Sequence, residues 1–321
     1  MLFSSQLFLY LFLPLFLLTY YLCPQRFRSA HMLLFSYVFY GWWRPDFLGL
    51  LIGVTVVSYY VAAAVEAAAV QNRKRWLAVG VTANLAALGY FKYANFGIDS
   101  LNALLTAAGF ETIGWTKIVL PIGLSFYIFQ AISYIIDVYR KTAPPARNLV
   151  DFAAFIALFP QLVAGPVLRY HDLAEQFYVR TYSWERFSRG SMIFMVGFCM
   201  KVLVADTVAP LVDAAFALQA PTLADAWIGA LAYTIQLFFD FAGYSTMAIG
   251  MALMIGFVFM ENFNDPYVSR SITEFWKRWH ISLSSWLREY LYISLGGNRK
   301  GRLRTYINLF LTMLLGGIWH G

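Results

Sequence analysis

Long apolar runs alternate with short polar and basic stretches along almost the whole chain. Most of the runs approach or exceed the roughly 20 largely apolar residues that a helix needs to cross a bilayer core. Because they are continuously apolar rather than alternating, they predict helices and not the strands of a membrane barrel. The runs lie near 2–23, 31–43, 47–70, 76–91, 118–138, 152–168, 190–217, 226–260 and 305–319.

Two of these runs are irregular. The run 152–168 contains Pro160, Gly165 and Pro166, so it predicts a re-entrant segment rather than a straight span. Such a segment is tolerated at membrane depth only where protein shields its freed backbone groups. The run 226–260 is long enough for one strongly tilted helix or for two shorter pieces.

Composition agrees with the pattern. Hydrophobic residues make up 60% of the chain and charged residues 13%, whereas soluble domains carry about 25% charged residues. We therefore predict an all-α, polytopic membrane protein with about 8–10 transmembrane or re-entrant helices. The first run lacks the basic start and the small-residue cleavage site of a secretory signal, so we expect a retained helix. The two cysteines, Cys23 and Cys199, are too few for a disulfide framework or a cysteine metal site.

The basic residues indicate an orientation, because Lys and Arg concentrate in cytoplasmic loops. Basic groups follow the first, third and fifth runs and the re-entrant segment, which places the N-terminus outside and 261–304 in the cytoplasm. From Arg270 to Arg304 the chain carries eight basic and two acidic residues, so most of the net charge of +7 lies there.

One amphipathic helix is predicted within this basic stretch. Ser271 and Glu274 form a capping-box pattern at its start, and the glycines from Gly296 end it. Lys277, His280, Ser284 and Arg288 recur on one side at helical spacing. The opposite side is apolar and carries Ile272, Phe275, Trp276, Trp279, Leu283, Trp286, Leu287 and Tyr290.

Two interpretations of this segment stay open at this point. It is either a lipid-surface anchor whose bases attract anionic headgroups, or a seat for a phosphate-bearing cytoplasmic cofactor. For the second, we expect exposed N–H groups in the turn GGNRKG, beside Arg299 and Lys300, to suit an anion. The turn matches neither a P-loop nor a dinucleotide fingerprint.

His320 lies in the nearly uncharged end GGIWHG. A polar side chain at membrane depth marks a functional site by default, and an imidazole can hold or release a proton near neutral pH. The alternative is a packing histidine bonded to a backbone carbonyl. Taken alone, His280 is predicted to be a solvated residue on the polar face of a surface helix. We assign no role to His31 and His171.

Several other polar residues fall inside apolar runs. They could line a transport pathway, which makes a transporter the competing class. The sequence contains no GxSxG elbow and no HExxH, and we expect no metal site. The residues in question are Glu66, Asn84, Asp137, Lys201, Asp206, Gln236 and Asp240.

Five stretches of the chain carry a resemblance to known proteins: LGYFKYANF (88–96), LPIGLSFYIFQAISYIIDVYR (120–140), FPQLVAGPVLRY (159–170), SITEFWKRWHISLSSWLREYLYISLGGNRKG (271–301) and NLFLTMLLGGIWHG (308–321). Together they resemble the membrane-bound O-acyltransferase (MBOAT) family, in its bacterial branch that O-acetylates secreted polysaccharide. The resemblance covers the whole chain, and alginate is the first expectation for the polymer, with cellulose or another exopolysaccharide second. Beside this branch, the competing class is a transporter of the polysaccharide export system, and a scaffold of the secretion complex is a third class.

The resemblance implies a fold and a set of roles. Helices would surround a central funnel between the two membrane faces, with acetyl-CoA arriving from the cytoplasm as acetyl donor. His320 would be the catalytic base and His280 a second functional position. Lys277, Arg278, Arg299 and Lys300 would contact the donor's phosphates. The partners implied are membrane lipid and periplasmic acetyltransferase proteins, with no nucleic acid, in a multi-pass protein of the bacterial inner membrane.

The same resemblance bears on domain organisation. Residues 1–321 would form a single membrane domain. Relatives usually continue for several helices beyond the histidine, so we expect the chain to lack its C-terminal helices.

Overall fold

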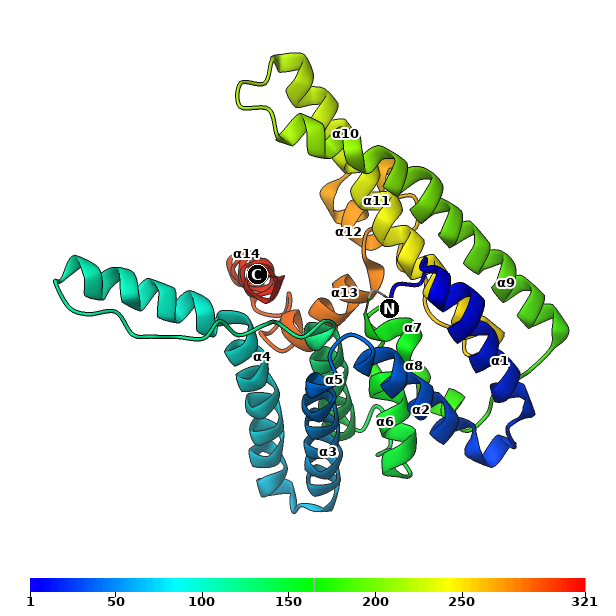
Figure 1. The fold of residues 1–321 in the computed structure, drawn as a ribbon. Helices are drawn as coiled ribbons and strands as arrows, with labels where there is room; N and C mark the ends of the chain where they lie inside the picture. Colours follow the sequence, from blue (N-terminus) through cyan, green and yellow to red (C-terminus); the bar gives the residue numbers. More distant parts are fainter. Residues whose placement is uncertain (164, 321) are drawn as a thin grey trace. The chain divides into compact units, whose positions relative to one another are not determined.

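The computed structural model describes residues 1–163 and 165–320. Within these residues the chain forms helices joined by turns and extended segments, and it contains no strand (Figure 1). The all-α prediction is confirmed. The chain divides into two compact units, each assembled from separate stretches of sequence. The single domain expected from the sequence stays a prediction.

The first unit comprises Met1–Arg44, Ala157–Leu168 and Asp172–Trp286. Its short helical turns are Phe8–Phe12, Gln25–Phe27, Glu175–Phe177, Met200–Ala205 and Pro266–Val268. Its helices are α1 (Leu13–Leu22), α2 (Arg28–Gly41), α7 (Phe159–Leu162), α9 (Trp184–Cys199), α10 (Asp206–Phe216), α11 (Leu223–Met254), α12 (Ile272–Arg278) and α13 (Ile281–Trp286).

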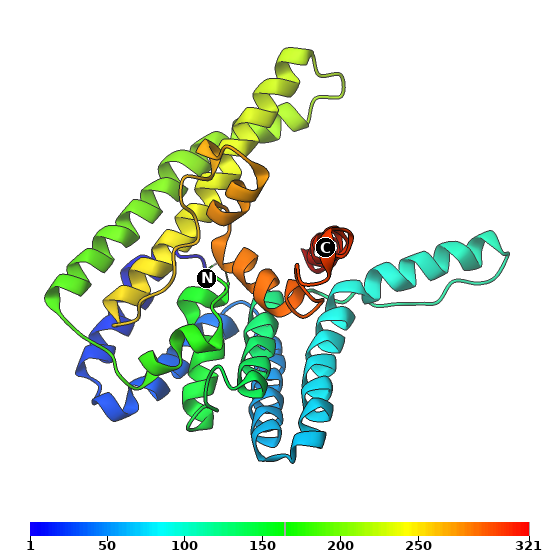
Figure 2. The ribbon, with the colours of Figure 1, turned by 180° about the vertical axis from the view of Figure 1, so that it is seen from behind.

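A long antiparallel helix pair dominates this unit (Figures 1 and 2). α9 continues through the π-helical turn Met200–Ala205 into α10, and α11 returns alongside both. Thr222 caps α11 with its side chain and accepts a hydrogen bond from the backbone of Asp225. Because α11 is unbroken as far as Met254, the run 226–260 forms one helix up to that residue and not two.

The second unit comprises Pro45–Ile156, Arg169–His171 and the chain from Leu287 onward. α3, α4 and α5 pack against one another, and Asn84 of α4 donates a hydrogen bond to Ser58 of α3 at 3.1 Å. Its elements are α3 (Asp46–Ala67), α4 (Val70–Ala107), α5 (Leu124–Arg140), the π-helical turn Leu287–Tyr292 and α14 (Gly301–His320). α6 (Leu149–Ala157) and α8 (Tyr170–Leu173) each straddle a boundary between the units.

α4 is longer than the run 76–91 suggested. It continues to Ala107, and the chain then returns beside it as an extended segment (Figure 1). Two asparagines of α4, two turns apart, hold this segment. The Asn95 side chain donates to the carbonyl of Ile118 and accepts from its N–H, and Asn102 makes the same two bonds with Ile113. Part of the run 118–138 is therefore extended chain, and α5 begins only at Leu124.

The interrupted run 152–168 is broken as predicted. α6 ends at Ala157 and α7 spans four residues. Serine side chains accept hydrogen bonds from backbone N–H groups freed in this segment: Ser36 from Phe159 at 3.1 Å, and Ser282 from Val167 at 2.9 Å. A re-entrant segment would need such bonds at membrane depth, and the re-entrant path itself stays a prediction.

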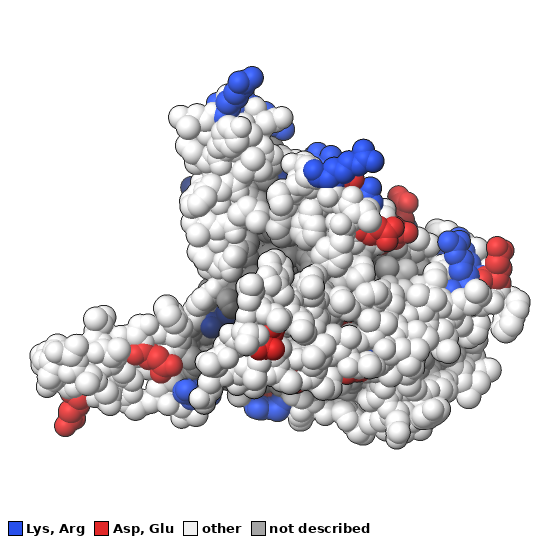
Figure 3. Space-filling model, turned by 90° about the horizontal axis from the view of Figure 1, so that it is seen from above, with Lys and Arg blue, Asp and Glu red and all other residues white. Residues whose placement is uncertain are grey.

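Three helical segments of the described chain are long and apolar enough to cross a membrane: Asp46–Ala67, Trp184–Phe216 and Leu223–Met254. Phe8–Leu22 is a shorter apolar helical segment. Figure 3 shows charged side chains in small patches and uncharged atoms over most of the visible face. The membrane assignment therefore holds, while the larger number of spans and the central funnel stay predictions.

Candidate active site

The amphipathic segment starts as expected but is not one helix. The Ser271 hydroxyl accepts a hydrogen bond from the backbone of Glu274 at 3.1 Å, and α12 begins there. The Glu274 carboxylate in turn accepts from the backbone N–H of Arg270, which lowers the pKa of that carboxyl. The helix then stops at Arg278, because His280 adopts a left-handed backbone conformation with φ of 44°.

This break reverses the predicted environment of His280. A continuous helix would place the side chain on the water-facing side, but it is only 5% exposed. The Phe241 ring lies perpendicular to the imidazole, with 4.7 Å between the ring centroids, and Nδ1 lies 3.2 Å from Oδ1 of Asn262. The prediction of a solvated His280 is wrong, since helical spacing applies only where the helix is unbroken.

His320 is the last described residue and ends α14. Its side chain is exposed in the described chain. Trp319 next to it stacks on Phe129 of α5, with ring centroids 4.6 Å apart. Lys92 of α4 donates a hydrogen bond to the Trp319 carbonyl. Contacts from α4 and α5 therefore hold the end of α14 that carries this histidine.

His280 belongs to the first unit and His320 to the second. The pairing of the two histidines in one site therefore stays a prediction.

The four predicted donor contacts divide in the same way. Lys277 and Arg278 belong to the first unit, Arg299 and Lys300 to the second. Lys277, Arg299 and Lys300 are exposed. Arg278 instead forms an ion pair with Glu274 at 3.0 Å and donates to the Asn264 carbonyl at 3.3 Å. Its guanidinium already serves the local structure.

The turn GGNRKG is built by glycines in left-handed conformations, with φ of 111° at Gly296 and 56° at Gly297. The expected row of exposed N–H groups is interrupted, because those of Gly296, Gly297 and Arg299 donate to carbonyls within the turn and the preceding segment. The turn also offers an anion the exposed Arg299 and Lys300 side chains.

A buried polar cluster in the second unit was not predicted. Asp137 of α5 is 1% exposed, and its carboxylate accepts a hydrogen bond from the Tyr290 hydroxyl at 2.7 Å. Nδ1 of His171 lies 2.9 Å from the same carboxylate. Burial, followed by the Asp137 charge, raises the pKa of Tyr290. An aspartate inside an apolar run was the one available signal, but its partners are distant in sequence.

The charged residues that suggested a transporter are paired, whereas Oε1 of Gln236 is buried without a hydrogen-bond partner in the described residues. Lys201, at the π-helical turn of the first unit, bonds Asp206 and lies 2.8 Å from Asp240 of α11. In the second unit Glu66 pairs with Arg73 at 3.3 Å. Opposite charges that neutralise one another serve packing and favour a structural use of these residues over an ion pathway.

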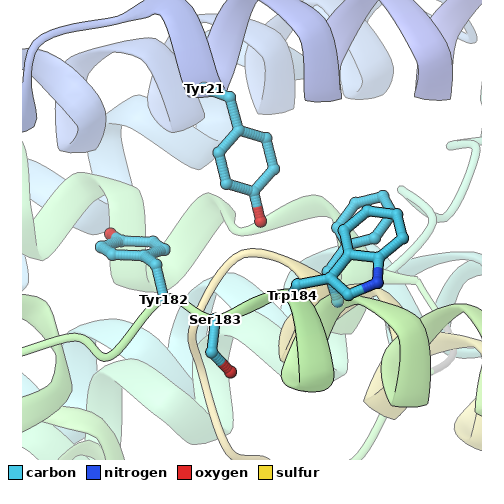
Figure 4. A pocket seen from close by; sticks show the side chains of 5 residues that line it. Tyr21, Tyr182, Ser183 and Trp184 are labelled. Carbon is cyan, nitrogen blue, oxygen red and sulfur yellow. The ribbon is translucent and has the colours of Figure 1, made fainter.

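A pocket of about 420 Å³ opens elsewhere in the first unit. Figure 4 shows Tyr21 pointing toward Tyr182 and Trp184 across it. Ser183 and Phe187 complete the lining. None of the six predicted site residues contributes to this aromatic pocket, so it has no part in the proposed chemistry.

Comparison with known proteins extends these observations. The family model described as "MBOAT, membrane-bound O-acyltransferase family" matches residues 146–321, a range that includes both histidines and all four bases. Proteins named "Probable alginate O-acetylase AlgI" are similar over the whole chain. The one from Azotobacter vinelandii is 63% identical over 323 residues, and the one from Pseudomonas syringae pv. tomato is 62% identical over the same length.

A more distant relative is a "Peptidoglycan O-acetyltransferase" from Helicobacter pylori, 36% identical over 356 residues and matched over 67% of its length. The chain spans 65% of the Azotobacter relative and 62% of the Pseudomonas syringae relative. With a family model that matches more than half of its residues, the chain belongs to the membrane-bound O-acyltransferase family.

Proposed function

We propose that the protein is an O-acetyltransferase of the bacterial inner membrane that supplies acetyl groups for O-acetylation of a secreted polysaccharide, with alginate the first choice. The observation that carries this proposal is the 62–63% identity, along the entire chain, to proteins named as alginate O-acetylases. The donor is acetyl-CoA from the cytoplasm, and periplasmic acetyltransferase proteins receive the acetyl group or complete its transfer.

His320 acts as the general base in this proposal. Its imidazole takes the proton from the acceptor hydroxyl, and the hydroxyl oxygen attacks the thioester carbonyl carbon. The carbon–sulfur bond then breaks, and the CoA thiolate leaves and takes up the proton. A site at membrane depth protects the thioester from competing water.

His280 is the second acid–base or donor-positioning group. Its burial supports a specific task, because a buried imidazole is retained only with hydrogen-bonding partners, and here one partner is Asn262. The exposed Lys277, Arg299 and Lys300 bind the donor phosphates. The lysines do so as single positive charges, and the arginine through two parallel N–H groups. Arg278 supports α12, and its contact with the donor is secondary.

The test is transfer of labelled acetyl from acetyl-CoA in membranes that carry the protein. His320→Gln should reduce transfer by about 10²-fold or more, the range in which general acid–base catalysis contributes, with the protein still inserted. His31→Gln is the control, since the ring of that histidine bonds the Thr19 hydroxyl and has no role in the proposed reaction. Transfer that persists in His320→Gln would remove His320 as the base.

A further inference from the structure

Asn262 sits at the centre of a buried polar cluster in the first unit. The residue is 1% exposed and belongs to the irregular segment that follows α11. Its side chain bonds Ser245 of α11, Ser282 of α13 and His280 at the break between α12 and α13. One carboxamide therefore joins three elements around the histidine.

The orientation of this carboxamide follows from its partners. The backbone N–H of Ser282 lies 3.2 Å from one of its terminal atoms. A backbone N–H can only donate, so that atom must be the oxygen, Oδ1. The amide nitrogen then points to the Ser245 hydroxyl at 2.9 Å and donates to it. The reversed orientation would set two donors against each other at Ser282.

The same reasoning fixes the proton on His280. Its Nδ1 lies 3.2 Å from Oδ1 of Asn262, an atom that can only accept. The Ser282 hydroxyl accepts from the backbone of Val167 at 2.9 Å and gives its one hydrogen to the same Oδ1 at 2.8 Å. At its longer distance of 3.4 Å from Nδ1 of His280, this hydroxyl can therefore only accept a hydrogen from the ring. Nδ1 of the imidazole must therefore carry hydrogen, and in the neutral ring the lone pair lies on Nε2.

We propose that Asn262 is a positioning residue that holds His280 in the Nδ1-protonated tautomer, so that the lone pair of the ring lies on Nε2. The catalytic consequence rests on the proposed function, in which His320 is the general base and His280 is the second acid–base or donor-positioning group. The tautomer itself does not depend on that function. The perpendicular Phe241 ring and the left-handed backbone at His280 hold the imidazole plane in place.

The first experiment is spectroscopic and needs no activity. The sequence contains four histidines, so the ¹⁵N spectrum of histidine-labelled protein in bilayers is simple, and His280→Gln assigns the signals of interest. At a pH where the ring is neutral, Nδ1 should give a protonated signal and Nε2 an unprotonated one. The opposite pattern in the unaltered protein would overturn the proposal.

Variants then test the cause. Asn262→Leu removes the acceptor and should abolish the preference for the Nδ1-protonated form, whereas Asn262→Asp keeps an acceptor and should retain it. Asn84→Leu is the matched control, because Asn84 is also buried and donates to a serine, Ser58, but its other hydrogen bond goes to the Gly80 carbonyl and not to a histidine. An unchanged His280 signal in Asn262→Leu would refute the role of Asn262.

The activity measurement separates the two proposals. A carboxylate beside an imidazole favours the charged ring, so Asn262→Asp should move the pH of half-maximal transfer upward by about one unit or more. Asn262→Leu should lower kcat by about 10-fold or more with little change in KM for acetyl-CoA.

Absence of transfer in the unaltered protein, with the predicted tautomer present, would reject the proposed function alone. An unshifted profile in Asn262→Asp would reject the catalytic role of Asn262.

Discussion

The backbones of α9 and α11 come into direct contact where Gly197 of α9 faces Gly243 of α11. A Cβ atom built on Gly197 would lie 2.6 Å from the Gly243 carbonyl oxygen, and one built on Gly243 would lie 2.8 Å from the Gly197 carbonyl oxygen. Two turns along, Gly190 and Gly250 repeat the relationship at 2.7 and 2.6 Å. Small residues at this spacing let membrane helices approach closely and gain packing that lipid cannot supply.

Gly197→Ala should therefore destabilise the protein, by about 1–3 kcal/mol of overpacking. Gly53→Ala is the control, because nothing lies within 4 Å of its added methyl group. In an open helical position the change from glycine to alanine is favourable by up to about 1 kcal/mol. Thermal unfolding in detergent should show a lower Tm for the first variant and an equal or higher Tm for the second. Equal shifts would mean that the glycine pair is not a tight contact.

Tyr290→Phe should destabilise the second unit. It removes a hydroxyl that donates to the buried Asp137 carboxylate at 2.7 Å, and a hydrogen bond to a charged group contributes about 1.5–3 kcal/mol. The comparison is Tyr306→Phe, since Tyr306 is 70% exposed. A Tm that falls equally in both variants, or in neither, would contradict the importance of this cluster.

Alkaline pH should weaken the same cluster. The pKa of Tyr290 is raised in the folded protein, by burial and then by Asp137, while in the unfolded chain it stays near 10. The unfolded state therefore loses a proton first. The contribution of Tyr290 is complete below about pH 10 and declines as the pH rises above it. Unfolding measured between pH 8 and pH 11 should show a shallower loss of stability in Tyr290→Phe than in the unaltered protein.

The exposed bases should affect donor binding rather than the chemical step, if the proposed function holds. Lys277→Gln and Arg299→Gln should each raise KM for acetyl-CoA several-fold with kcat nearly unchanged, because they remove binding made equally in the ground and transition states. The effect should shrink at high salt. Transfer of labelled acetyl from acetyl-CoA, measured at two salt concentrations, gives KM and kcat under each condition.

Arg278→Gln should behave differently. Its guanidinium pairs with Glu274 and with the Asn264 carbonyl, so the expected result is lower stability and little specific effect on KM. A rise in KM that matches Lys277→Gln, with Tm unchanged, would place Arg278 among the donor contacts after all.

Sequence alone determined much of the local structure. The apolar runs at 47–70 and 190–217 became α3 and the continuous helix from Trp184 to Phe216. The interruption near Pro160 became a helix break, and Ser271 became the residue that starts α12. These features depend on a bilayer-length run of apolar residues or on hydrogen bonds within one turn, and neighbouring residues specify both.

Only the tertiary structure decided the surroundings of the functional candidates. Helical spacing placed His280 in water, but one left-handed residue ended the helix and turned the imidazole toward Asn262. Likewise, Asp137 meets Tyr290 across a separation of 153 residues. Periodicity describes the faces of a single unbroken element. It carries no information on which distant segment will supply the acceptor that a buried donor requires, and packing alone makes that choice.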